Sequence, residues 1–432
     1  MLVHIVSRGE TLFSIAERYG VDESILAFNN DISDPLRLPV GQPIAVAVPT
    51  VTHTVSLGET LSSIASCYGV SIETIYKNNL FLNGSDKINI GQLLYIVIER
   101  APLGEFATGG YAYPFVGKQL LSRALPLMAA LMPFTYGFKP DGSLIPPDDE
   151  EMIGLAKQYR SEPIMHLSTL DENDVFSVEL AKMLFDSPLL QQSLLDSVIA
   201  NMQSKGYTSL DVDFEFIGGE NANKYAEFIR YCKSRLSPYG YGVMTALAPK
   251  TSDNQPGALY EGHDYALLGE AADAVLLMTY EWGYTYGPPM AVSPIKPVAD
   301  VVDYALTRIP REKILLGISN YGYDFILPYV QGVSRATSVS TRRAFDLASN
   351  YGAEIFFDSV ALAPYFDYTE NGNVHRVWFE DVRSISARLN LMADRGLRGA
   401  LWWNLNRENN QSLVAINSLI DIKSLDLYSN NQ

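Results

Sequence analysis

The sequence predicts an α/β protein in which a (β/α)8 barrel, the TIM-barrel fold, follows two small βααβ units. Three observations predict this arrangement. An internal repeat fills the first 98 residues. After it, short apolar runs alternate with amphipathic helical patterns, which is typical of parallel strands connected by helices. One of these runs also carries an acidic residue at every second position, as expected of a barrel strand that ends in an active site.

Two copies of one motif occupy residues 1–48 and 51–98. Gly9-Glu10-Thr11-Leu12 in the first copy recurs as Gly58-Glu59-Thr60-Leu61 in the second. Each copy reads as strand, helix, helix, strand. Thr11 and Thr60 are the expected helix N-caps, because each precedes an apolar-periodic run and a threonine oxygen can accept a backbone N–H there.

Each copy resembles the LysM module over almost its whole length. The resemblance implies binding of glycans that contain N-acetylglucosamine, in a groove between the loops at 9–11 and 32–38, or at 58–60 and 86–90. The implied glycan-binding residues are Gly9, Glu10, Thr11, Gly58, Glu59 and Thr60. The alternative is a repeat kept for packing that has lost its ligand. Short linkers at 49–50 and 100–104 predict restricted swinging of the modules rather than a free tether.

Residues 104–428 supply the eight strands of the expected barrel. The candidate strands lie at residues 108–113, 127–134, 163–167, 209–215, 242–247, 274–279, 314–318 and 399–404. Helical patterns lie between most of them, for example at 189–205, 222–236 and 298–308. A doubly wound open sheet is the alternative. No glycine-rich phosphate-binding motif opens any of these helices, which weakens a nucleotide-binding version of that alternative.

The acidic strand is Ser209-Leu210-Asp211-Val212-Asp213-Phe214-Glu215-Phe216. Alternation along a strand places its three acidic residues on one face and Val212, Phe214 and Phe216 on the other. Like charges and lost hydration both disfavour ionisation, so at least one carboxyl should have a raised pKa. Glu215, at the end of the strand, is the natural general acid. The alternative is a solvated acidic face.

This strand resembles the second half of the DxxDxDxE motif of glycoside hydrolase family 18, the chitinase family. Thr208 stands where the first aspartate of that motif belongs. The resemblance extends to Met278-Thr279-Tyr280-Glu281, similar to the family's MxYD with glutamate for aspartate, and to Gly399-Ala400-Leu401-Trp402-Trp403, similar to its last strand. The implied catalytic set is Asp211, Asp213, Glu215 and Tyr280. Alternation lets one of the two tryptophans face inward, and the resemblance favours Trp403.

Aromatic and polar residues gather at the C-terminal ends of the expected strands, where barrel enzymes have their active sites. Aromatic rings stack on sugar rings while polar groups bind the hydroxyls. We therefore expect substrate contacts from Trp403, Tyr136, Met278, Glu281, Trp282, Asn320 and Tyr321. The alternative for either tryptophan is ordinary core packing. After the seventh strand, residues 365–379 read as one hairpin with an Asn-Gly turn, which predicts a low wall and a shallow cleft suited to a branched glycan.

Composition limits the partners. The chain has 432 residues, is 47% hydrophobic and has a formal net charge of −17, which argues against nucleic acid or an anionic membrane as partner. No apolar run approaches the length of a membrane helix. The N-terminus shows no standard signal peptide. We expect a monomer, and the family resemblance implies no metal and no cofactor.

The combination of LysM modules with this barrel resembles the cortex-lytic N-acetylglucosaminidases of endospore-forming bacteria. The resemblance implies hydrolysis of peptidoglycan after N-acetylglucosamine, with retention and with the substrate's own acetamido group as nucleophile. It also implies a location in the spore, in the cortex or coat region, reached without a standard signal peptide; the alternative is association with the cell wall. The alternatives are a chitinase or chitooligosaccharide hydrolase, and a non-catalytic glycan-binding protein of the spore wall. Endo or exo action and a requirement for muramic-δ-lactam stay open.

Overall fold

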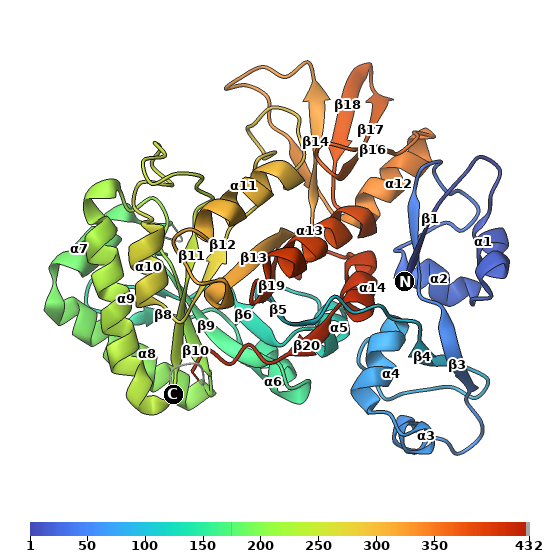
Figure 1. Cartoon of the computed structure of the whole chain (residues 1–432), viewed down its shortest axis with the longest axis horizontal. Coiled ribbons are helices and arrows are strands. Elements are labelled where there is room, and N and C mark those ends of the chain that lie inside the picture. The colour runs from blue at the N-terminus through green and yellow to red at the C-terminus, as the bar shows by residue number, and fades with distance from the viewer. Residues whose placement is uncertain (174, 429–432) are drawn as a thin grey trace.

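The computed structural model describes residues 1–173 and 175–428, and it contains the predicted barrel (Figure 1). Parallel pairing runs through eight strands and closes where β19 pairs with β5. A further strand, β20 (Asp421–Lys423), pairs with the start of β5. The barrel strands are β5 (Glu105–Ala112), β6 (Ala130–Pro133), β9 (Glu162–Ser168), β10 (Ser209–Asp213), β11 (Gly242–Leu247), β12 (Ala274–Leu277), β13 (Ile314–Ser319) and β19 (Gly399–Trp403).

Helices cover the outside of the barrel. Their ends follow local chemistry: Ser187 caps α8 by accepting the N–H of Leu190, and Gly206 ends that helix in the left-handed conformation that glycine adopts without strain. The helices around the barrel are α5 (Lys118–Ala124), α6 (Glu150–Gln158), α7 (Val178–Asp186), α8 (Pro188–Lys205), α9 (Ala222–Leu236), α10 (Tyr265–Ala271), α11 (Ile295–Ala305), α13 (Val382–Arg395) and α14 (Asn410–Leu419). A short hairpin, β7 (Gly137–Phe138) and β8 (Leu144–Ile145), follows β6.

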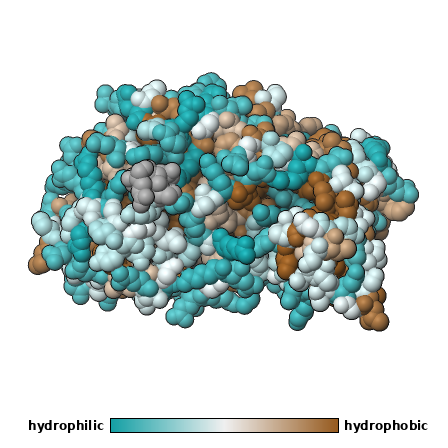
Figure 2. Space-filling model, turned by 60° about the horizontal axis from the view of Figure 1, so that its bottom comes forward, coloured by the Kyte–Doolittle hydropathy of each residue, from teal (hydrophilic) through white to brown (hydrophobic). Residues whose placement is uncertain are grey.

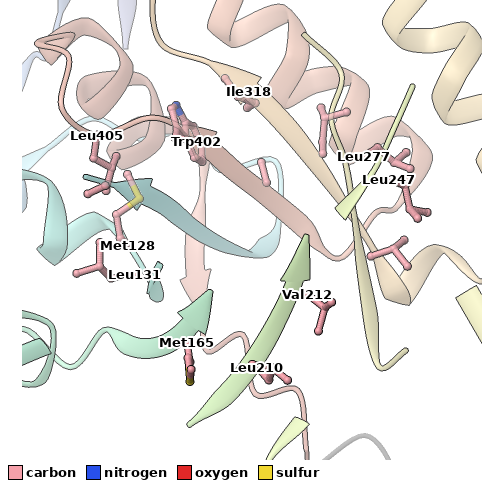
Figure 3. Packing of buried hydrophobic residues seen from close by; sticks show 14 of the residues in the cluster. Met128, Leu131, Met165, Leu210, Val212, Leu247, Leu277, Ile318, Trp402 and Leu405 are labelled. Carbon is pink, nitrogen blue, oxygen red and sulfur yellow. The ribbon is translucent and has the colours of Figure 1, made fainter. Parts of the chain in front are cut away.

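The barrel strands separate two apolar layers. Outward-facing side chains such as Val212, Leu247 and Trp402 pack under the helices (Figure 3). Inward-facing ones such as Met132, Met244 and Leu401 fill the interior of the barrel. Because successive side chains alternate between the layers, the residues between the outward-facing ones reach the interior and the mouth of the barrel.

The expectation of a single hairpin after the seventh strand is wrong. Residues 322–378 form a five-stranded antiparallel sheet with a helix, and this insertion rises above the barrel in Figure 1. Residues 363–378 do form a hairpin, but further strands pair with both of its edges. In these further strands, apolar and polar residues alternate less clearly. The insertion consists of β14 (Gly322–Leu327), β15 (Thr337–Val339), α12 (Thr341–Tyr351), β16 (Phe356–Asp358), β17 (Ala363–Glu370) and β18 (Asn373–Trp378).

The two N-terminal units have the predicted βααβ order. In each, the predicted threonine caps the first helix and forms a capping box with a serine three residues on. A buried asparagine, Asn30 or Asn79, bonds both backbone groups of a residue on the closing strand. The elements are β1 (Leu2–Ile5), α1 (Leu12–Tyr19), α2 (Glu23–Asn29) and β2 (Pro43–Val46), then β3 (Pro49–Thr54), α3 (Leu61–Tyr68), α4 (Ile72–Asn78) and β4 (Leu93–Ile98).

Both modules are docked on the barrel through α14. The side-chain amide of Gln411 donates to Asn30 and to the carbonyl of Pro43, and the amide of Asn417 donates to Asn78. The first module also touches the insertion, because the N–H of Ile355 donates to the carbonyl of Val40 over 2.8 Å. These buried hydrogen bonds hold the modules and the barrel together, which agrees with the expectation that the short linkers do not form a free tether.

No helix in the described part of the chain is long and apolar enough to cross a membrane. On the face shown in Figure 2, a mostly hydrophilic surface is interrupted by apolar patches toward the right, the side on which Figure 1 places the modules. Exposed apolar side chains of the modules include Leu57 and Ile90.

Candidate active site

The acidic residues follow the predicted pattern up to the end of β10, which lies at Asp213. The chain then turns: Phe216 has a positive φ of 57° and is half exposed, so the expectation that it packs with Val212 and Phe214 is wrong. Phe214 is fully buried and stacks against Phe228. Glu215, which lies between Phe214 and Phe216 in the sequence, lines a cavity at the mouth of the barrel.

Two buried side chains fix the turn that carries Glu215. The ring of His263 accepts the N–H of Ala248 at Nδ1, so its Nε2 carries the proton and donates to the carbonyl of Phe214 over 3.0 Å. Burial lowers the pKa of His263, which favours this neutral form. The hydroxyl of Tyr225 bonds to the carbonyl of Val212 over 3.1 Å. Glu215 therefore follows a strand end that is held from both sides.

The cavity has a volume of about 670 Å³. Asp213, Glu215 and Tyr280 supply its polar groups at the strand ends, and Met278, Glu281, Trp282 and Trp403 also line it. A second lobe lies between the loop after β11 and helix α11, with Gln255, Tyr260 and Asp300 on its walls. Seven of the predicted site residues thus share one cavity.

An aromatic cluster forms one wall. The rings of Phe134 and Trp403 lie 4.9 Å apart, and Tyr113 lies 5.0 Å from Phe134. Trp402 is buried on the other side of the strand, where its indole N–H donates to Ser412. The structure therefore places Trp403, and not Trp402, on the inner side of the strand, as expected. Such rings can stack on the apolar face of a sugar.

Burial and like charges act on the general-acid candidate. Burial raises the pKa of Glu215, and the neighbouring charges of Asp213 and Glu281 raise it further. Tyr280 stays a neutral hydroxyl, because burial and then Asp213 raise its pKa far above the usual range. A protonated carboxyl, an adjacent carboxylate and a phenol are thus available in the same cavity.

Asp211 lies beneath the cavity and does not line it. Its side chain is fully buried, and it accepts the hydroxyl of Tyr111 over 2.8 Å. Burial raises the pKa of Asp211 to about 6, opposed by the charge of His166. Asp211 is therefore placed to act on Asp213 rather than on a substrate, in contrast to its predicted place in the catalytic set.

Three predicted substrate contacts are placed elsewhere. Tyr136 is buried outside the barrel, where its hydroxyl contacts Asp149 and Lys205, although its backbone still pairs with Leu167 of β9. The amide of Asn320 is used within the fold, since it donates to the carbonyls of Asn404 and Arg407. Tyr321 donates to Glu281, as does Tyr323 over 3.0 Å, so both tyrosines hold a residue of the cavity rim.

The sequence analysis did not predict Gln255, Tyr260 and Asp300 on the cavity walls, nor four residues at or beneath its base: Tyr111, Tyr113, Phe134 and His166. Tyr111 and Tyr113 lie in or directly after β5, Phe134 directly follows β6 and His166 lies in β9. Alternation along the predicted strands could have found Tyr111 and His166, because each faces inward from a run that was recognised as a barrel strand.

The predicted glycan-binding residues of the modules lie on matching loops. Glu10 accepts the N–H of Ser7 and contacts His4, and Glu59 accepts the N–H of Ser56 and contacts His53. Thr11 and Thr60 cap helices, and Gly9 and Gly58 both have a φ of 86°. These glutamate and threonine side chains therefore shape their own loops.

Comparison with known proteins agrees with these features. The family model for glycosyl hydrolases family 18 matches residues 172–408, and the LysM domain model matches residues 4–47 and 53–97. The cortical fragment-lytic enzyme of Bacillus subtilis (strain 168) is 35% identical over 98% of this chain and 99% of its own length. Crystal structures of the spore cortex-lytic enzyme SleL from Bacillus megaterium QM B1551 and from Bacillus cereus each superpose with a TM-score of 0.82 and 32% identity, covering 98% of both chains. The chain therefore belongs to family 18 of the glycosyl hydrolases, and it is a glycoside hydrolase with two LysM modules at its N-terminus.

Proposed function

We propose that this glycoside hydrolase cleaves spore-cortex peptidoglycan after N-acetylglucosamine. The observation that carries the proposal is the shared cavity of Asp213, Glu215, Tyr280 and Trp403. The names of the relatives, a cortical fragment-lytic enzyme and two spore cortex-lytic enzymes, support the cortex as substrate and the spore as location. We expect the protein to act as a monomer, with the two LysM modules bound to the same glycan.

The proposed reaction uses the substrate's acetamido group as nucleophile, which is an exception among retaining glycosidases. Glu215 protonates the glycosidic oxygen, and the acetamido oxygen attacks the anomeric carbon to form an oxazolinium ion. Asp213 orients the acetamido group and balances its positive charge, while Tyr280 donates a hydrogen bond to it. Glu215 then removes a proton from water, which opens the ring with net retention. The raised pKa of Glu215 supports its role as acid.

The substrate is tested by digestion. Purified spore-cortex fragments and chitin are each incubated with the protein, and the new reducing ends are identified by mass spectrometry. The proposal expects N-acetylglucosamine at the new reducing ends of the cortex fragments and much slower release from chitin. Reducing ends that carry muramic acid would contradict the proposed linkage.

The nucleophile is tested with an Asp213→Asn variant and a thiazoline analogue of N-acetylglucosamine. The analogue mimics the cyclised intermediate, so it should inhibit the wild type and bind the variant much more weakly, because the cationic ring loses its counter-charge. An enzyme nucleophile instead predicts a covalent adduct trapped by a fluorosugar. Detection of that adduct by intact-mass measurement would overturn substrate assistance without affecting the family assignment.

A chitinase is the second candidate, because the insertion at residues 322–378 removes the reason for which the sequence favoured a branched glycan. The sequence predicted a low wall here and hence a shallow cleft for a branched glycan, but the structure has a five-stranded sheet. The shape of the cleft therefore no longer favours peptidoglycan, and that preference rests on the relatives. Faster release from chitin than from cortex fragments in the same digestion would favour the chitinase.

A further inference from the structure

His166 lies directly beneath the cavity and is fully buried. Its Nε2 is 3.4 Å from one carboxylate oxygen of Asp213 and 3.9 Å from one of Asp211. Within the described residues, Nε2 of His166 and the other carboxylate oxygens, Oδ1 of Asp211 and Oδ1 of Asp213, have no hydrogen-bond partner. A buried polar atom without a hydrogen-bond partner lowers the stability of the folded state. Three such atoms in one cluster therefore indicate a functional role.

The partners of the other ring nitrogen indicate where the protons are. Nδ1 of His166 lies 2.6 Å from the hydroxyl of Thr135, and that hydroxyl also reaches the carbonyl of Tyr136 and the hydroxyl of Ser168. A threonine hydroxyl has one proton to donate. If it donates to one of these oxygens, Nδ1 must carry a proton itself. Nε2 faces Asp211 and Asp213. If both are ionised, a lone pair on Nε2 would be repelled, so Nε2 also carries a proton.

In the described part of the chain, the surroundings of the His166 ring contain no other source of positive charge. Tyr111 from β5 lies 5.4 Å away and stays neutral, because burial raises its pKa well above the usual range. Phe134, directly after β6, lies 4.8 Å from the ring of His166 with its own ring tilted. Among the described residues, His166 is the one side chain able to carry a positive charge that lies within ion-pair distance of Asp211 or Asp213.

We propose that His166 is a positioning residue for Asp213: as an imidazolium, it keeps the Asp213 carboxylate ionised and directed at the acetamido group of the substrate. This inference rests on the proposed substrate-assisted reaction. Two adjacent buried carboxylates commonly share one proton. Here the positive charge comes from a side chain beneath them, so neither aspartate has to take up a proton before the substrate binds.

The charge of His166 is measured directly by NMR of the protein labelled with ¹⁵N in its five histidines, without substrate. The proposal expects one imidazole with protons on both nitrogens at neutral pH. Its signal should disappear in His166→Gln and should change to that of a neutral ring in Asp213→Asn. If His166→Gln does not fold, Thr135→Val identifies the signal, because it removes the hydroxyl against Nδ1. A neutral His166 in the wild type would overturn the proposal.

Kinetics supply the second test. His166→Gln keeps an amide donor near the position of Nε2 but has no charge. We expect kcat to fall roughly tenfold to a hundredfold, as for a misplaced reacting group, with KM little changed because His166 does not line the cavity. The acid limb of the pH profile should move to higher pH, because the variant lacks the positive charge that His166 places 3.4 Å from the Asp213 carboxylate. His53→Gln, in a module, is the matched control.

An unchanged kcat and pH profile in a folded His166→Gln protein would refute the positioning role. Failure of the proposed function is a separate outcome: the wild type would then release no N-acetylglucosamine ends from cortex fragments. The NMR result does not depend on which glycan is cleaved. Kinetics are therefore measured on an N-acetylglucosamine oligosaccharide that the wild type hydrolyses.

Discussion

The protein contains two kinds of histidine–carboxylate–tyrosine cluster, one in each LysM module and one beneath the barrel cavity. In the second module, His53 contacts Tyr68 through Nδ1 and Glu59 through Nε2, and Glu59 also accepts the N–H of Ser56. His4, Tyr19 and Glu10 repeat this arrangement. In the barrel, by contrast, Nε2 of His166 and one oxygen each of Asp211 and Asp213 have no partner within the described residues.

The difference separates groups that stabilise a loop from groups arranged for chemistry. Each module cluster lies near the surface, and both nitrogens of its histidine have partners. The barrel cluster is buried, holds adjacent carboxylates and contains unpartnered atoms, an arrangement that costs stability and is expected at functional sites. The same three residue types therefore have opposite consequences for folding, and variants can test this.

The largest effect is expected on the barrel side. Glu215→Gln should lower kcat by about 10²- to 10⁴-fold, because the general acid is lost. Thermal unfolding should occur at the same or a higher temperature, since a carboxyl whose charge is disfavoured by burial and by Asp213 becomes a neutral amide. Glu227→Gln, exposed on α9, is the control. Turnover close to that of the wild type would exclude Glu215 as the acid.

A second comparison concerns the buried asparagines of the modules. Asn79→Ala removes the partners of both backbone groups of Tyr95, and each orphaned group costs about 1–3 kcal/mol. Asn30→Ala does the same to Ala45 and also removes an acceptor of Gln411 on α14. Urea unfolding should show that both variants are destabilised, Asn30→Ala more strongly. Equal losses would mean that the contact with Gln411 adds little to docking.

The third prediction concerns Asp31, which is buried where the first module contacts the barrel. Its carboxylate accepts the N–H of Asn410, and burial raises its pKa from 3.8 to about 7. Between these values the folded state holds a proton that the unfolded chain has lost, so stability falls as pH rises through this window. Asp31→Asn removes this slope. Its unfolding temperature relative to the wild type should therefore rise from pH 4 to pH 7 and level off above.

Other buried acids with a raised pKa, such as Glu380, are present in both proteins. Their effects therefore cancel in the difference between the two unfolding temperatures. The exposed neighbour Asp34 provides the control Asp34→Asn. A difference between Asp31→Asn and the wild type that stays constant across this pH range would show that Asp31 is ionised in the folded protein.

The smallest effect is expected on the module side. The N–H of Ser56, and then His53, lower the pKa of Glu59, so its contribution to stability is present at neutral pH and is lost as pH falls through the folded pKa. Glu59→Gln should unfold at a slightly lower temperature at neutral pH, with no difference in acid. Glu10→Gln should lose more, because Glu10 also pairs with Arg18 over 2.7 Å. Neither variant should change kcat on soluble oligosaccharides, and a change would contradict the division between the two kinds of cluster.

The sequence was sufficient for the features that depend on local pattern. Apolar runs between helical patterns identified all eight barrel strands, the family resemblance identified Trp403 as the inward tryptophan, and cap residues identified the helix starts of the modules. It failed beyond the ends of strands, as at Phe216 and Tyr136, because the pattern of a strand says nothing about the residues that follow it. The five-stranded insertion was missed because its pairings join segments far apart in the sequence, such as β14 with β18. His166 was missed because a lone histidine becomes informative only beside the two aspartates.

The docking of the modules on α14 determines how this enzyme can search a polymer. A catalytic domain on a flexible tether samples every bond within reach of its anchor. Here Gln411 and Asn417 fix the modules relative to the cleft. A glycan chain bound to the modules would thus place at Glu215 only those glycosidic bonds that lie at one fixed distance from the bound sugars. To reach the next bond the protein must release the glycan chain and bind it again, so cutting should be periodic along a regular polymer and depend on how its strands are oriented.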